Sequence, residues 1–234
     1  ARGSGRIGSD FGTKVFQLNP RIGVTTFGWA FLQPQNAAIL TSIGTLVEDF
    51  RVTINPQVTV ADAANLLAQH FQQIYQYDIT TLNWNPALAG QMAIGFQVAG
   101  YNENSTLGEV YLCSIPPGNS QFLLNTHNPG CNWQGQTDVI TRLVLGFDPR
   151  IGSLAFAQHF SANPLPNQPS LIDQLRSLQY QIQWNAMTLQ DAIDLSVLMI
   201  NSTINMQRFS DGIVSNPGDI PGCGGEIDVA VITH

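Results

Sequence analysis

The stretch KVFQLNPRIGVTTFG, residues 14–28, decides the fold of this chain. Apolar residues alternate with polar ones on both sides of the Asn-Pro pair at 19–20, and this pair is typical of a turn. The pattern predicts two β-strands, at 15–18 and 22–27, that form a hairpin. The second strand ends at Gly28, since glycine often marks the end of a strand.

Lys14 precedes this hairpin and is the only lysine of the chain, so eight arginines carry the rest of the positive charge. A lysine ammonium is a compact charge, and enzymes use it to lower the pKa of a neighbouring nucleophile or amine. The alternative is an ordinary solvated residue at the end of a strand, because lysine is almost never fully buried. Residue type alone favours this alternative.

Four segments carry apolar residues at the three- and four-residue spacing of an amphipathic helix. The second has Asp62 in its first turn, where a carboxylate interacts favourably with the helix dipole. The last opens with Thr188, a good N-cap, and Gln190 or Asp191 can bond back to the first turn. The predicted helices span 32–50, 60–77, 136–146 and 188–203.

A second hairpin is predicted from strands at 91–99 and 108–114, and the Pro-Pro-Gly turn at 116–118 ends it. The apolar run 227–232 predicts a buried closing strand. Loops rich in Gly, Pro or Asn are predicted at 161–169 and 211–225. Helices follow one another in runs instead of alternating singly with strands. This order favours an α+β protein with two antiparallel sheets and helices layered outside them.

Composition argues against two classes of partner. Only 11% of the 234 residues are charged, and the formal net charge is −7 at pH 7. Nucleic acids and anionic membranes need clustered Lys and Arg, so neither is expected as a partner. No apolar run reaches the length of a membrane span. The length alone permits one large domain or two small ones.

The cysteines and histidines form no recognisable site. Cys113, Cys131 and Cys223 lie far apart, and their odd number fits no closed disulfide framework. A reducing, cytoplasmic environment is therefore expected. The four histidines are scattered and are not spaced with one another or with Cys as metal ligands are, so no metal is expected. The Gly-rich stretch at 3–8 lacks the Gly-Lys-Ser/Thr ending of a phosphate loop, and no cofactor is expected.

Three motifs resemble one family when they are taken in order. The run 9–28 has a lysine before an apolar strand and Thr-Thr-x-Gly at the end of the next. VAGY at 98–101 is followed by GEVY at 108–111, and CGGEIDVAVIT closes the chain at 223–233. These motifs are similar to those of the proteasome β-subunit and bacterial HslV-type branch of the N-terminal-nucleophile hydrolases, and they frame almost the whole chain.

The resemblance implies a single domain over 1–234 with the fold of that family, a four-layer αββα sandwich of two antiparallel sheets. It implies a threonine-, serine- or cysteine-type peptidase that hydrolyses peptide or other amide bonds. In such an enzyme the side chain of the first residue is the nucleophile, and its own α-amine is the base, with an intrinsic pKa of roughly 7.7–8.0. Homo-oligomers are expected from the resemblance only.

The resemblance also assigns roles to five residues. Lys14 matches the family's catalytic lysine, and the backbone N–H of Gly28 matches its oxyanion-hole donor. An extended substrate is expected to lie between the stretch from Arg2 to Ser4 and the stretch from Thr26 to Gly28. Thr26 and Ala30 are expected to line the pocket beside the nucleophile.

The start of the sequence departs from the family pattern. The family's nucleophile lies one hairpin upstream of the lysine, that hairpin is missing here, and Ala1 has no nucleophilic atom. A preceding segment of roughly fifteen to twenty residues is therefore expected. The alternative is a catalytically inactive scaffold subunit that assembles into rings. Lys14 and the TTFG motif favour the enzyme, whereas the missing nucleophile favours the scaffold.

Late positions depart as well. Gln136 and Cys223 stand where the family has two serines, and a Gly/Pro-rich insertion removes any clear match to its late aspartate. Asp211 and Asp219 are the candidates for that carboxylate. These changes also favour the scaffold.

Overall fold

The computed structural model describes ten stretches of the chain. These are residues 12–35, 37–81, 92–125, 127, 129–154, 158–159, 169–209, 212–213, 216–217 and 223–234. They divide into two compact units. One unit contains the described residues of 136–227, and the other contains those of 12–135 together with 228–234. That the chain forms a single domain stays a prediction.

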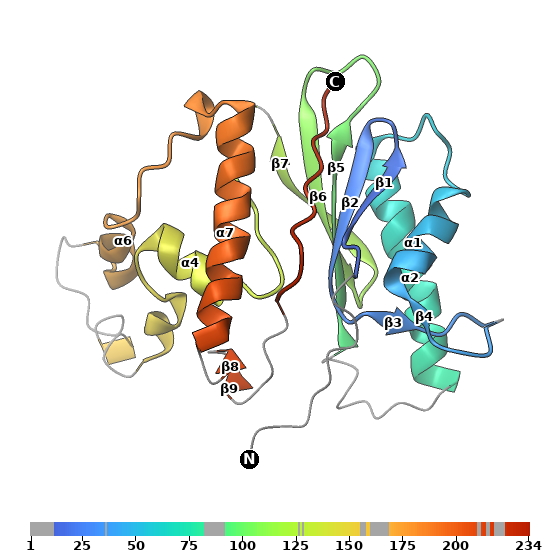
Figure 1. Cartoon of the computed structure of the whole chain (residues 1–234), viewed down its shortest axis with the longest axis horizontal. Helices are drawn as coiled ribbons and strands as arrows, with labels where there is room; N and C mark the ends of the chain where they lie inside the picture. The colour runs from blue at the N-terminus through green and yellow to red at the C-terminus, as the bar shows by residue number, and fades with distance from the viewer. Residues whose placement is uncertain are drawn as a thin grey trace. The chain divides into compact units, whose positions relative to one another are not determined.

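The larger unit is built on a five-stranded antiparallel sheet (Figure 1) with strand order β1-β2-β5-β6-β7. The chain is thus an α+β protein, as its pattern predicts. Both predicted hairpins are confirmed, but the third hairpin strand, β7, was not predicted. The strands are β1 (Val15–Asn19), β2 (Ile22–Gly28), β5 (Ile94–Tyr101), β6 (Gly108–Ile115) and β7 (Asn119–Asn125).

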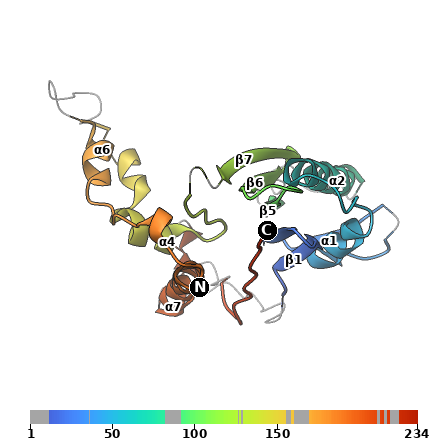
Figure 2. The ribbon, with the colours of Figure 1, turned by 90° about the horizontal axis from the view of Figure 1, so that it is seen from above.

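Two helices, α1 (Ile43–Arg51) and α2 (Val60–Thr81), cover one face of this sheet (Figure 2). Alternate strand residues point at them because side chains in a strand alternate between its two faces. Phe71 of α2 and Phe96 of β5 are both fully buried, with ring centroids 4.6 Å apart. Burial of each such side chain stabilises the fold by about 1.5–3 kcal/mol, so this helix–sheet layer holds the unit together.

Helix α1 begins eleven residues later than the spacing predicts. The short strands β3 (Phe31–Leu32) and β4 (Thr41–Ser42) pair with each other and take the place of its predicted first turns. Ser42 is the N-cap, and its hydroxyl accepts a hydrogen bond from the N–H of Thr45 at 3.1 Å. Pro34 disfavours helix in the residue before it.

Asp78, in the last turns of α2, is fully buried. Its Oδ2 accepts a hydrogen bond from the backbone N–H of Gln33 at 2.9 Å, which fixes the chain just after β3. Its Oδ1 has no hydrogen-bond partner within the described part of the chain. Burial raises the pKa of this carboxyl, and the hydrogen bond from Gln33 offsets part of that effect.

We expect Asp78→Asn to raise the free energy of unfolding at pH 7 by about 1 kcal/mol, because it replaces a buried, half-satisfied carboxylate with a neutral amide. The folded protein binds a proton at Asp78 more readily than the unfolded chain does. Lowering the pH from 7 towards 4 therefore stabilises the wild type relative to the variant. Urea unfolding at pH 7 and pH 4.5 measures both effects. An unchanged or lower stability at pH 7 contradicts this account of Asp78.

The smaller unit is helical. Its α4 (Asp138–Leu145) and α7 (Leu189–Phe209) contact each other, and Ile140, Val144 and Met199 are buried in this unit. The short elements are η2 (Pro149–Ser153), α6 (Leu171–Arg176), η3 (Trp184–Ala186), β8 (Gly212–Ile213) and β9 (Asn216–Pro217).

The predicted cap of α7 is confirmed. The N–H of Asp191 donates to the Thr188 hydroxyl at 3.1 Å, and the N–H of Thr188 donates to the Asp191 carboxylate at 3.0 Å. The two bonds form a reciprocal capping box. None of the helices in the described residues is both long enough and apolar enough to span a membrane.

The predicted closing strand 227–232 is wrong. Residues 226–234 form no strand, and Val229 and Val231 are 50% and 46% exposed. The last residues instead lie against the sheet. A Cβ built on Gly23 would be 3.0 Å from the Ile232 side chain, and the rings of His234 and Tyr101 are 5.7 Å apart. An alternating apolar pattern makes a strand only where a backbone partner is present.

Candidate active site

Lys14, Thr26 and Gly28 lie together where β1 begins and β2 ends. The backbone N–H of Thr26 donates to the carbonyl of Lys14 at 3.0 Å. This bond continues the β1–β2 register, in which Val15 is opposite Thr25. Lys14 therefore lies directly across from Thr26 and two residues from Gly28 along β2. The turn at 20–21 and a β-bulge between Gln17 and Asn19, which shifts the pairing by one residue, together set this register.

The Lys14 side chain is exposed to solvent. Its ammonium makes no ion pair or hydrogen bond with the described residues. A lysine with its donors unused at the end of a sheet is available to a group that docks there. An ordinary solvated lysine has the same exposed environment. The residues around Lys14 therefore decide between a functional and a purely surface role.

Gly28 has a left-handed backbone, with φ of 87°. A Cβ at this position would lie 2.2 Å from the carbonyl oxygen of Ala93, so only glycine fits. That carbonyl accepts the N–H of Trp29 at 2.9 Å. Since inward and outward hydrogen bonds alternate along an antiparallel strand, the N–H of Gly28 is directed away from β5, towards the side of β1 and Lys14.

The other predicted site residues differ in accessibility. Thr26 is only 7% exposed and faces the core, so its side chain offers little surface to a ligand. Ala30 is half-buried, and its carbonyl accepts the N–H of Ile43 at 2.9 Å, which ties the site to the start of α1. Arg2 lies outside the described residues. Ala93, whose carbonyl fixes the backbone at Gly28 and Trp29, was not predicted. Its role depends on the long-range pairing of β2 with β5.

The smaller unit brings together the two positions matched to family serines. Gln207 of α7 is 3% exposed. Its Nε2 donates to Oε1 of Gln136, and its Oε1 accepts the N–H of Cys223 at 3.1 Å. One buried amide thus links three distant segments. No local pattern in the sequence distinguishes Gln207 from the other polar residues of its helix. Asp211 and Asp219 lie outside the described residues.

All three cysteines are free thiols. Cys113 is fully buried, its Sγ donates to the carbonyl of Ala64 at 3.3 Å, and burial raises its pKa to about 12. Burial also raises the pKa of Cys131 and of Cys223. A raised pKa leaves less of the nucleophilic thiolate, so none of the three is an activated nucleophile.

We expect iodoacetamide at pH 7.5 to leave Cys113 unmodified in the folded protein. Cys131 and Cys223 should be alkylated at least several-fold more slowly than in urea, because thiolate is the reacting form. Mass spectrometry of tryptic peptides measures the extent at each cysteine. Faster alkylation of Cys223 in the folded protein than in urea would show that it is activated and would refute this description.

No cluster of three or more potential metal ligands occurs among the described residues. His70 of α2, half-buried, packs near two phenyl rings, with centroid distances of 5.2 Å to Phe50 and 5.5 Å to Phe71. Burial lowers its pKa, an effect that the nearby Asp49 carboxylate opposes in part. His70 is therefore a packing residue in this unit.

Comparison of the chain with protein-family models, with curated proteins and with solved structures found no match. The geometry of the sheet end is therefore the basis for assigning a function.

Proposed function

We propose that this chain belongs to an N-terminal-nucleophile hydrolase of the proteasome β-subunit type, which cleaves peptide or other amide bonds. One observation carries the proposal. The β1–β2 register sets the only lysine opposite Thr26, beside a glycine whose N–H is directed to the same side by the alternation of hydrogen bonds along β2. At this end of the sheet the cation can activate a nucleophile, and the backbone N–H can serve as an oxyanion-hole donor.

In the proposed mechanism the nucleophile is the side chain of the first residue of the mature enzyme, which this mechanism requires to lie upstream of Ala1. Its α-amine takes the proton of the hydroxyl or thiol as the oxygen or sulfur attacks the amide carbon. The Lys14 ammonium favours the neutral amine and the ionised nucleophile, because a nearby cation opposes protonation. The N–H of Gly28 stabilises the oxyanion of the tetrahedral intermediate.

The second face of the sheet supports the finer fold proposal, a four-layer sandwich. This face is opposite α1 and α2 and carries Thr25, Phe27, Ala99, Val110 and Leu112, all only half-buried. Extended residues 228–234 lie on part of it. A half-covered apolar face calls for another layer, and we propose that a second antiparallel sheet supplies it.

The remaining features of the proposal follow from the enzyme class. The substrate is an extended peptide that lies along the end of β2 near Gly28, beyond the start of β1, in a manner similar to strand addition. The working form is a homo-oligomer, and the compartment is the reducing cytoplasm, in keeping with three free thiols.

The mature N-terminus of protein expressed from the complete gene tests the proposal. We expect Edman sequencing to find Thr, Ser or Cys as the first residue, about twenty residues before Ala1, freed by processing. An intact, folded protein whose first residue is Ala1 would refute the enzyme and leave the ring-forming scaffold.

A further inference from the structure

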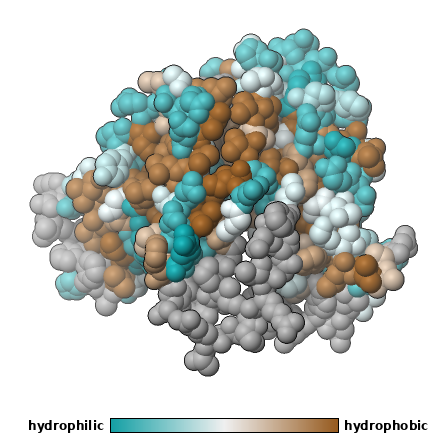
Figure 3. Space-filling view, viewed as in Figure 1, coloured by the Kyte–Doolittle hydropathy of each residue, from teal (hydrophilic) through white to brown (hydrophobic). Residues whose placement is uncertain are grey.

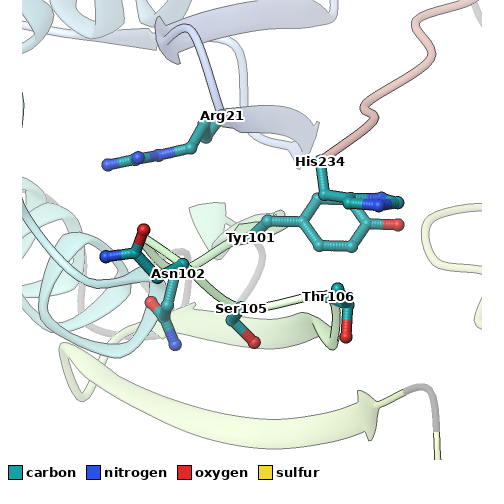
Figure 4. A pocket seen from close by; sticks show the side chains of 7 residues that line it. Arg21, Tyr101, Asn102, Ser105, Thr106 and His234 are labelled. Carbon is teal, nitrogen blue, oxygen red and sulfur yellow. The ribbon is translucent and has the colours of Figure 1, made fainter.

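A pocket lies at the other end of the sheet, where the β1–β2 and β5–β6 turns meet the end of the described chain (Figure 4). Its volume is about 290 Å³. Along the seven residues of β2 it is separated from Gly28 by roughly 20 Å. It belongs entirely to the larger unit. The lining residues are Arg21, Tyr101, Asn102, Asn104, Ser105, Thr106 and His234.

Arg21 is the cation of this pocket, and its donors are largely unused. Its side chain is 31% exposed, and its guanidinium lies 3.8 Å from the carboxylate of Glu103. That distance is too long for a hydrogen bond. Within the described residues the guanidinium has no closer polar partner. A partly sheltered guanidinium with five donors and no hydrogen bond is a site for a planar or tetrahedral oxyanion.

The main chain around Arg21 is fixed. Its N–H donates to the side chain of Asn19 at 2.9 Å, and its carbonyl accepts the N–H of Tyr101 at 3.0 Å. Across the pocket, Asn102 is held by bonds to the N–H of Val60 at 2.8 Å and to Glu109 at 3.2 Å. The walls are therefore shaped before any ligand arrives, which lowers the entropic cost of binding.

The other lining groups suit the same ligand. Figure 4 shows Arg21 across from Ser105 and Thr106, with the rings of Tyr101 and His234 on one side. The hydroxyls of Tyr101 and Thr106 form no hydrogen bond with the described residues, and Figure 4 shows them on the side of the pocket away from the Arg21 guanidinium, where they can donate to a second polar group of a larger ligand. The tilted rings of Tyr101 and His234 offer an apolar surface to the body of a small molecule.

We propose that this pocket binds a small oxyanion, a carboxylate or a phosphate, with Arg21 as its anchor. Glu103 is the internal competitor, since its carboxylate is the nearest negative charge to the guanidinium. The site is independent of the proposed catalytic end of the sheet, and its test requires no enzymatic activity.

Isothermal titration calorimetry of the folded chain at low ionic strength tests this site, with citrate and inorganic phosphate in separate titrations and glycerol as the uncharged control. We expect citrate or phosphate to bind, and the tighter anion identifies the ligand class. Arg21→Gln should raise the dissociation constant at least about tenfold, because it removes a charge-assisted bidentate contact. The matched control is Arg51→Gln on α1, where the arginine pairs with Glu48 at 3.0 Å. Equal affinities for the two variants, or no binding of either anion to the wild type, overturn the proposal.

Glu103→Gln is a second test variant. It should leave the stability of the fold unchanged, because the Glu103 side chain is 54% exposed in a turn. Removal of the competing carboxylate should tighten anion binding several-fold, since like charges repel. Unchanged or weaker binding by this variant also overturns the proposal.

Discussion

Lys14→Ala in the complete, processed protein should slow covalent labelling by an electrophilic peptide at least about 100-fold. The reason is electrostatic. Lys14 lies across from Thr26 at the sheet end, and loss of its charge lets the α-amine of the nucleophile hold a proton and stop acting as a base. The rate of adduct formation, followed by intact-protein mass spectrometry, measures this effect.

The stability of the same variant separates catalysis from folding. The side chain of Lys14 is exposed, so the free energy of unfolding should change by no more than about 0.5 kcal/mol. Arg51→Ala, which removes a cation elsewhere on the sheet unit, is the matched control and should label at the wild-type rate. If Lys14→Ala labels as fast as Arg51→Ala, Lys14 is an ordinary surface residue.

Gly28→Ala should damage both stability and labelling. Alanine is strained at φ of 87°, and its Cβ would meet the Ala93 carbonyl at 2.2 Å. Relief of that contact must separate the end of β2 from β5, at a cost of about 2–4 kcal/mol in the free energy of unfolding. The same movement displaces the N–H proposed for the oxyanion, and labelling should fall by at least about 100-fold.

Gly12→Ala is the matched control for this substitution. It lies near the same sheet end, but a Cβ there has no heavy atom within 4 Å. Its stability and labelling should both stay at the wild-type level. Urea unfolding and the labelling rate, measured on both variants, provide the comparison. A Gly28→Ala protein as stable as Gly12→Ala would contradict the backbone geometry on which the proposed oxyanion hole depends.

Local signals explain which parts of the fold the sequence predicts. The first hairpin is predicted because strand alternation and the Asn-Pro turn agree within fifteen residues. β7 was missed because Pro-Pro-Gly at 116–118 indicates an end, although the chain turns there and continues as NSQFLLN. The 227–232 run has a strand pattern, yet whether it pairs depends on which segments lie beside it.

The residues of the candidate site also fall into those that local signals predict and those that they do not. Lys14 and Gly28 are predictable because both belong to one hairpin, although the β-bulge between Gln17 and Asn19 that sets their exact register was not predicted. Ala93 and Gln207 act through hydrogen bonds to residues at least 16 positions away. Such contacts depend on the packing of whole elements, which residue type and spacing do not specify.

The residue that carries the peptide adduct tests the account most directly. The complete, processed protein would be labelled with an electrophilic peptide, digested and mapped by tandem mass spectrometry. The account predicts one adduct, on the Thr, Ser or Cys that begins the mature chain, and its loss in Lys14→Ala. An adduct on Cys131 or Cys223 would contradict the account. The absence of any adduct on a folded protein that begins with Thr, Ser or Cys would contradict it as well.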